Sequence, residues 1–191
     1  MTKEIFLIRH TTPNVAQGVC YGQLDLNVAD SFRKEAKQIR DVINNNSIRT
    51  VYSSPLIRCT NLAQYLFPEN GVMYLNELME MNFGQWEGKV WSKISPEALK
   101  HWSNNFLTIA PPEGESFSQM IDRVKYFWCK NILKSTEDSI AICTHSGVMR
   151  VIAMELLGIP PDKIFNLKMN YGAVIKIQIN QDFHQLEFLK G

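Results

Sequence analysis

Two arginines and two histidines follow short apolar segments of the chain, either directly or within one helical turn: Arg9, His10, Arg58 and His145. Such a cluster would attract a dianion. A guanidinium group suits phosphate because it donates two parallel hydrogen bonds and keeps its charge near neutral pH. Taken singly, each of these residues is more often a surface charge or a structural histidine, so the argument depends on their convergence. His101 and His184 follow no apolar segment, and we expect no chemistry from them.

The elements that must position these side chains alternate along the chain. Short apolar segments predict strands at 5–8, 50–53, 72–75 and 140–143, and two more strands within 173–189 around a turn at 180–182. Apolar residues at helical spacing, with capping residues and prolines at their ends, predict helices at 30–45, 56–66, 96–106, 116–133 and 147–157.

This alternation predicts an α/β fold with a mostly parallel sheet and helices on both faces, that is, a three-layer αβα sandwich. In such sheets, ligands bind beyond the carboxyl ends of the strands. Residues that directly follow the strands are therefore the ones to examine for chemistry, and the four charged and titratable residues above lie there.

Composition limits the class of protein further. The 191 residues suit one domain, residues 1–191, and 45% apolar with 20% charged residues is ordinary for a globular protein. A formal net charge of +1 provides no general attraction for nucleic acid. No apolar segment approaches the roughly 20 residues of a membrane span, and the N-terminal one is too short for a signal peptide, so we expect a cytoplasmic location.

Four cysteines are present, but none forms a C-x-x-C pair, so neither a zinc ribbon nor a redox motif is indicated. Two disulfides are possible by number, although a chain of this size does not need them. The histidines lack ligand-like spacing and no carboxylate cluster follows a strand, so we expect no metal site and no cofactor.

Five segments, in the same order, resemble motifs of the histidine phosphatase superfamily, also called the phosphoglycerate mutase-like family. Residues 7–11 resemble its L-x-R-H-G signature, 21–25 its G-x-x-D segment, 53–58 its S-S-P-x-x-R motif, 80–88 its E-x-x-F-G-x-x-E-G motif, and 144–147 its T-H-G-G motif. The resemblance spans residues 5 to about 158 and implies a phosphoglycerate mutase-like fold. Three positions depart from the pattern: Thr11, Ala16 and Ser146.

The resemblance implies a role for each residue of the site. His10 would be the nucleophile that forms a phosphohistidine, and its ordinary pKa near 6.5 makes the neutral ring available. Arg9, Arg58 and His145 would hold the non-bridging oxygens of the phosphoryl group. Tyr21 and Gly22 could approach the substrate, although a plain turn explains Gly22 almost as well.

Glu80 is the candidate general acid, which would protonate the leaving alkoxide and then deprotonate the attacking water. Glu77 and Glu87 are nearby competitors. Residues 113–116 also resemble a family segment; either Ser116 or Glu115 could start the following helix, and a contact with the phosphate or the leaving group is a second possibility.

The resemblance leaves the substrate open among small phosphomonoesters. The segment between Gly88 and Glu113 is short for a lid, which favours hydrolysis over a mutase reaction that must exclude water. Residues 9–13 and 18–25 resemble alpha-ribazole phosphatases, which remove the 5′-phosphate of alpha-ribazole phosphate in cobalamin nucleotide-loop assembly. Nearby aromatic residues could stack on a benzimidazole or could pack in the core: Tyr21, Phe83, Trp86, Trp91 and Trp102.

Three alternatives remain. The enzyme could be a broad phosphomonoesterase for sugar phosphates or phosphoglycerates, or a phosphoglycerate mutase. A catalytically dead phosphate-binding module would be expected to lack His10 or Glu80, and both are present. A homodimer is possible, in which residues 172–179 would pair strands between two copies unless they lie in the interior.

Overall fold

The computed structural model describes residues 2–43, 48–180 and 183–191, and these form one six-stranded sheet in the order β3-β2-β4-β1-β5-β6. The strands are β1 Lys3–Arg9, β2 Thr50–Ser53, β3 Val72–Tyr74, β4 Ser139–Thr144, β5 Val174–Ile179 and β6 His184–Lys190. Neighbouring strands are parallel from β3 through β1, and β5 is antiparallel to both β1 and β6. The expected mostly parallel sheet is confirmed.

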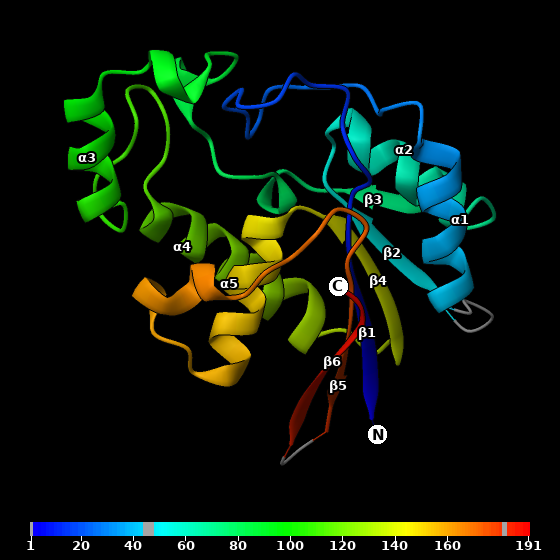
Figure 1. The fold of residues 1–191 in the computed structure, drawn as a ribbon. Coiled ribbons are helices and arrows are strands. Elements are labelled where there is room, and N and C mark those ends of the chain that lie inside the picture. Colours follow the sequence, from blue (N-terminus) through cyan, green and yellow to red (C-terminus); the bar gives the residue numbers. More distant parts are fainter. Residues whose placement is uncertain (1, 44–47, 181–182) are drawn as a thin grey trace.

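Helices cover both faces of this sheet, with α1 and α2 on one face and α4 and α5 on the other, as Figure 1 shows. The α-helices are α1 Phe32–Ile43, α2 Ile57–Leu66, α3 Pro96–Asn105, α4 Phe117–Phe127 and α5 Ser146–Leu157. Short 3₁₀ helices are η1 Asn76–Leu78, η2 Gly84–Trp86, η3 Trp91–Lys93 and η5 Pro161–Asn166. The layers agree with the predicted αβα sandwich.

The helix predicted over 116–133 divides in two. Ser116 and Gln119 form a reciprocal capping box at the start of α4, so Ser116 is the N-cap. The α-helix ends at Phe127 and continues as a π-helical segment, η4 Trp128–Leu133. Trp128 and Ile132 remain buried in this segment, so the apolar stripe read from the sequence is kept although the hydrogen-bond pattern widens.

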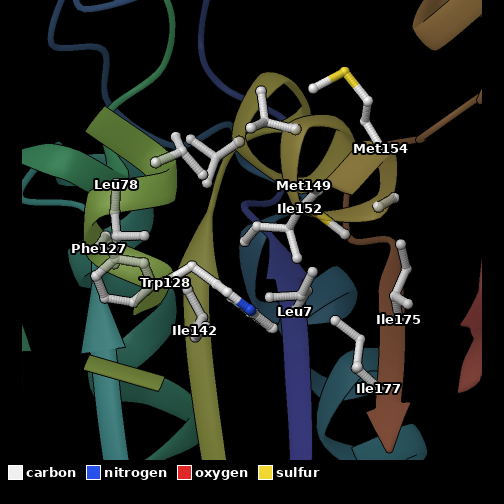
Figure 2. Packing of buried hydrophobic residues seen from close by; sticks show 14 of the residues in the cluster. Leu7, Leu78, Phe127, Trp128, Ile142, Met149, Ile152, Met154, Ile175 and Ile177 are labelled. Atoms are coloured by element: carbon white, nitrogen blue, oxygen red, sulfur yellow. The ribbon is translucent and has the colours of Figure 1, made fainter. Parts of the chain in front are cut away.

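The central strands are buried on both faces, as their continuous apolar segments predicted. Alternate residues of β1 enter different clusters: Ile5 and Leu7 pack under α4 and α5, whereas Phe6 and Ile8 pack under α1 and α2. Figure 2 shows the first cluster, in which Leu7 lies among side chains from β4, β5 and α5. These two clusters hold the sheet between its helix layers.

Two further expectations are settled by the fold. β5 is an interior strand between β1 and β6, so the idea that residues 172–179 pair with a second copy is wrong. All four cysteines are free. The expected helix end at 44–45 and residues 181–182 of the expected turn lie outside the described residues. Within the described part of the chain, no helix has the length and apolar character that a bilayer crossing requires.

Candidate active site

Strand register brings the candidate residues to one edge of the sheet. Arg9 of β1 pairs with Thr144 of β4, and the His10 N–H donates to the Thr144 carbonyl at 3.0 Å. The ring centroids of His10 and His145 consequently lie 5.0 Å apart. Residues separated by about two thirds of the chain thus meet beyond the carboxyl ends of two parallel strands.

The buried ring of His10 has a defined tautomer. Its Nδ1 lies 2.7 Å from the Thr11 carbonyl oxygen, which can only accept, so Nδ1 carries the proton and donates it. Burial, followed by the positive charges of Arg58 and Arg9, lowers the pKa of His10 well below its usual value. The ring is therefore neutral near pH 7, and Nε2 holds an unprotonated lone pair that can act as a nucleophile.

Arg58 is fully buried at the start of α2. Its Nη1 donates to the Leu24 carbonyl at 2.9 Å and its Nη2 to the Gly22 carbonyl at 2.5 Å, while its buried Nε has no hydrogen-bond partner. A buried guanidinium bound only by neutral carbonyls keeps its charge uncompensated, which is costly unless an anion completes the site.

Arg9 provides a second guanidinium group, and its positive charge is also uncompensated within the described part of the chain. Its Nη1 donates to the Met169 carbonyl at 2.5 Å, its Cζ lies 4.1 Å from the centre of the Tyr171 ring, and its buried Nε is unpartnered. Among the described residues, neither Arg9 nor Arg58 forms an ion pair with a carboxylate. Arg9 lines the pocket with His10, whereas Arg58 is fully buried and does not line it. The charges of both guanidinium groups act on His10 and favour an anion beside it.

His145 lies at the base of this cluster and is fully buried. Its Nε2 is 2.9 Å from the Ser54 Oγ and 3.4 Å from the Cys59 Sγ. Burial, then the neighbouring His10 and Arg58, lower its pKa well below the usual value, so it is neutral without a phosphate present. It retains one N–H to donate, and it contributes to the site from behind the pocket rather than from its surface.

Glu80 lines the same pocket as Arg9 and His10. Its carboxylate accepts hydrogen bonds from the Met81 N–H at 3.0 Å, the Gly147 N–H at 3.1 Å and the Ser146 hydroxyl at 3.3 Å. Two of these donors belong to the first turn of α5, whose backbone N–H groups lack partners within the helix. Ser146, a departure from the family pattern, thus binds the candidate acid directly.

The two competing carboxylates lie elsewhere. Glu87 accepts hydrogen bonds from the backbone N–H groups of Gln23, Leu24 and Phe83, so it holds two loops together. Glu77 lines a different, shallower hollow beside Arg123. Of the three candidates, the structure brings Glu80 alone to the pocket that contains His10.

Tyr21 and Gly22 have separate positions. Tyr21 lines the pocket, and its hydroxyl is hydrogen-bonded to that of Tyr171; burial raises the pKa of Tyr21. Gly22 is buried and does not line the pocket. A Cβ at this position would lie 1.8 Å from the Met81 carbonyl oxygen, so backbone packing explains the glycine better than an approach to substrate.

The pocket has a volume of about 270 Å³ and is lined mainly by two kinds of side chain, polar and aromatic. Its polar residues are Arg9, His10, Tyr21, Glu80, Ser146 and Arg150. Its other aromatic residues are Phe83, Trp91, Trp102, Phe117 and Phe165. Trp86 does not line the pocket; it is buried with Cys20 and Ile94, and the pocket residues Phe83, Trp91 and Trp102 pack against this cluster. The pocket is therefore lined both by charged groups and by flat apolar rings.

Sequence reasoning missed Arg150 and Tyr171. Arg150 lies one helical turn after Ser146 on α5, and that spacing was a usable signal. Its Nε donates to the Leu167 carbonyl at 3.1 Å, and burial lowers its pKa. Tyr171 follows no recognised motif; it reaches the site because the segment before β5 passes over Arg9.

Residues 113–116 serve the structure rather than the pocket. The side chain of Glu113 accepts from Gln85, Glu115 pairs with Arg123 at 2.6 Å, and Ser116 caps α4. No group of three or more His, Cys, Asp and Glu side chains among the described residues is arranged to hold a metal ion.

This fold and this arrangement of histidine, arginines and carboxylate define an α/β phosphatase. The chain belongs to the histidine phosphatase superfamily (branch 1), whose family model matches residues 5–190.

Sequence identity to individual relatives is modest. The chain is 26% identical to the adenosylcobalamin/alpha-ribazole phosphatase of Escherichia coli K12, over 98% of this chain and 96% of that protein. It is 32% identical to phosphoglycerate mutase-like protein 4 of Arabidopsis thaliana, over 77% and 68%. The solved alpha-ribazole phosphatase of Shigella flexneri superposes with a TM-score of 0.89 at 25% identity, over 98% and 96% of the two chains.

Proposed function

We propose that this enzyme hydrolyses phosphomonoesters through a phosphohistidine at His10, and that its substrate is alpha-ribazole 5′-phosphate. The observation that carries the mechanism is the neutral His10 ring, with Nε2 unprotonated, beside two arginines that lack carboxylate counter-ions. A phosphate dianion supplies the missing negative charge and brings phosphorus next to the nucleophile.

In the first step, the Nε2 lone pair attacks phosphorus and the bond from phosphorus to the ester oxygen breaks. Glu80, in its protonated form, gives its proton to the departing oxygen, so that an alcohol leaves. The ring gains a positive charge on becoming phosphorylated. The hydrogen bond from Nδ1 to the Thr11 carbonyl stabilises that charge, and Arg9 and Arg58 bind the non-bridging oxygens.

In the second step, water attacks the phosphorus and gives a proton to the Glu80 carboxylate. The P–N bond breaks and its electron pair returns to Nε2, which restores neutral His10 and releases inorganic phosphate. Glu80 thereby recovers the proton that it gave in the first step. This cycle needs no redox chemistry and uses no group beyond the side chains described.

Two observations support alpha-ribazole phosphate as the substrate. The pocket that contains His10 is also lined by Phe83, Trp91 and Trp102, whose rings contact one another and can pack against a flat heteroaromatic base. The E. coli and Shigella proteins to which this chain is similar are named as alpha-ribazole phosphatases.

A broad phosphatase for phosphoglycerates or related small acids is the second candidate. Arg150 favours it, because this arginine lines the pocket. Among the described residues it donates one hydrogen bond, from Nε, and its terminal nitrogens can therefore bind a substrate carboxylate. A relative from Hydrogenobacter thermophilus, 24% identical over 98% of this chain and 95% of its own length, is named putative phosphoserine phosphatase 2.

The test measures phosphate release in the presence of EDTA from alpha-ribazole 5′-phosphate, 3-phosphoglycerate and para-nitrophenyl phosphate in parallel. His10→Ala is compared with His101→Ala, a matched histidine control on the exposed side of α3. We expect His10→Ala to be inactive and to form no phosphoenzyme after denaturing quench, and His101→Ala to match the wild type.

The outcomes separate the parts of the proposal. A preference for alpha-ribazole phosphate of about a hundredfold in kcat/KM, about 2.7 kcal/mol of transition-state discrimination, supports the narrow substrate. Comparable rates on all three esters support the broad phosphatase with the same mechanism. Full activity of His10→Ala, or loss of wild-type activity in EDTA, would refute the phosphohistidine mechanism.

A further inference from the structure

Arg123, in the middle of α4, uses every N–H of its guanidinium group. Nε donates to Glu115 Oε2 at 2.9 Å and Nη2 donates to Glu115 Oε1 at 2.6 Å. Nη1 donates to the carbonyls of Glu77 and Met79, each at 2.8 Å, and Nη2 also donates to the carbonyl of Glu80 at 3.1 Å. Five donors thus meet five acceptors, three of which belong to the segment that carries Glu80.

Glu115 completes the attachment from the other side. Its Oε1 accepts from the Asn82 N–H at 2.8 Å, and its own N–H donates to the Asn82 carbonyl at 2.9 Å. The backbone is therefore fixed before, at and after Glu80 by one ion pair with side chains only 20% and 15% exposed. A partly buried bidentate pair of this kind is far more rigid than an exposed one.

The carboxylate end of Glu80 is held separately, by the first turn of α5. The residue thus bridges two helices, with its carbonyl bound to α4 through Arg123 and its side chain bound to α5. Arg123 does not line the pocket with His10 and does not touch the place where substrate binds. Burial and the nearby His10 lower the pKa of His145 most, and the charge of Arg123 adds to this. Because lysine keeps that charge, a change from arginine to lysine acts on the reaction through the position of Glu80.

We propose that Arg123, paired with Glu115, is a positioning residue for the proton transfers of Glu80. This inference rests on the proposed function, in which Glu80 protonates the leaving group. Lysine cannot replace the arginine, because an ammonium group has three donors and no planar fork, so at least two of the five acceptors would lose their partner. A shift of the carboxylate by about 1 Å costs about a hundredfold in rate.

The test uses the dependence on the leaving group. An alkyl ester such as alpha-ribazole 5′-phosphate or 3-phosphoglycerate releases an alkoxide that needs a proton, whereas para-nitrophenyl phosphate releases an anion that is stable without one. The measured quantity is kcat/KM for both kinds of ester, because it reports the phosphorylation step. The variants are Arg123→Lys and Glu115→Gln, with Glu80→Gln as the reference for lost acid catalysis.

Lys125→Met is the matched control, because Lys125 also lies on α4 and forms an ion pair, with Glu155 at 2.9 Å, that does not involve the Glu80 segment. We expect Arg123→Lys to lower kcat/KM for the alkyl ester by about tenfold or more and for the aryl ester by less than about threefold, in the same direction as Glu80→Gln. Glu115→Gln should show a smaller loss of the same kind, and Lys125→Met should match the wild type.

Two results overturn the inference in different ways. In the first, Glu80→Gln lowers kcat/KM more for the alkyl ester than for the aryl ester, but Arg123→Lys and Glu115→Gln lower kcat/KM for the two esters equally or leave it unchanged. The ion pair between Arg123 and Glu115 then only supports the fold. If Glu80→Gln itself affects both esters equally, the acid role in the proposed function is wrong and the inference fails with it. Melting temperatures of all variants show whether a uniform loss comes from unfolding.

Discussion

Replacing Gly147 by alanine should displace Glu80 without disturbing the helix that carries the substitution. Gly147 is the second residue of α5, and a Cβ there would lie 2.1 Å from Glu80 Oε1 and 3.2 Å from its Cδ. Ordinary van der Waals contact begins near 3.4 Å, so the carboxylate must withdraw by more than 1 Å. The other close atom, the Met120 Cε at 2.8 Å, is the end of a flexible side chain.

The expected loss follows from that displacement. A shift of about 1 Å in a reacting group lowers the rate about a hundredfold, which corresponds to about 2.7 kcal/mol. Alanine also has a better helix propensity than glycine, by up to about 1 kcal/mol, which offsets part of the steric cost. We therefore expect kcat/KM for an alkyl phosphate ester to fall about a hundredfold while the melting temperature changes by no more than about 4 °C.

The assay compares Gly147→Ala with Glu155→Ala, which introduces alanine on the same helix away from the pocket. Phosphate release from the alkyl ester and the thermal unfolding curve are measured on the same preparations. Wild-type kcat/KM in Gly147→Ala would refute the contact between α5 and the Glu80 carboxylate. A large fall in melting temperature would instead show that the helix itself cannot accept the Cβ.

Two further predictions concern stability. The folded-state pKa values of His10 and His145 are lowered, so below about pH 6.5 the unfolded chain takes up protons that the folded protein does not. The free energy of unfolding is therefore highest above that pH. Below it, the free energy of unfolding falls by up to about 1.4 kcal/mol per histidine for each pH unit. Urea titrations at several pH values check this, and an unchanged pH dependence in His10→Asn would contradict it. Gly22→Ala should destabilise the fold by about 1–3 kcal/mol in denaturant unfolding, because its Cβ would collide with the Met81 carbonyl; wild-type stability would contradict that packing.

The motif resemblance selected Glu80 from three nearby glutamates, and tertiary contacts bring Glu80 rather than Glu77 or Glu87 to the pocket. Glu77, Glu80 and Glu87 lie within eleven residues and have the same chemistry. Their environments differ because Glu87 binds backbone N–H groups of its own loops, whereas Glu80 reaches the first turn of α5. Local sequence contains no information about which N–H groups a folded chain brings to each side chain.

The same reason explains the residues that sequence reasoning missed or misplaced. Arg150 and Tyr171 gain their positions from contacts with Phe165 and Arg9, each in another element. Trp86 and Trp91 are in ring contact in one cluster, yet Trp91 lines the pocket and Trp86 does not. For these side chains, orientation depends on packing between elements that are distant in the chain.

The sequence by itself determined the αβα layers and the location of the chemistry. Continuous apolar segments specify strands buried on both faces, and residues such as His10 and His145 that directly follow parallel strands must meet at one edge. Only the tertiary structure decided the tautomer of His10, the lack of carboxylate partners for Arg9 and Arg58 among the described residues, and the hydrogen-bond partners of Glu80. Burial and hydrogen-bond partners set these properties, and both exist only after distant segments have packed together.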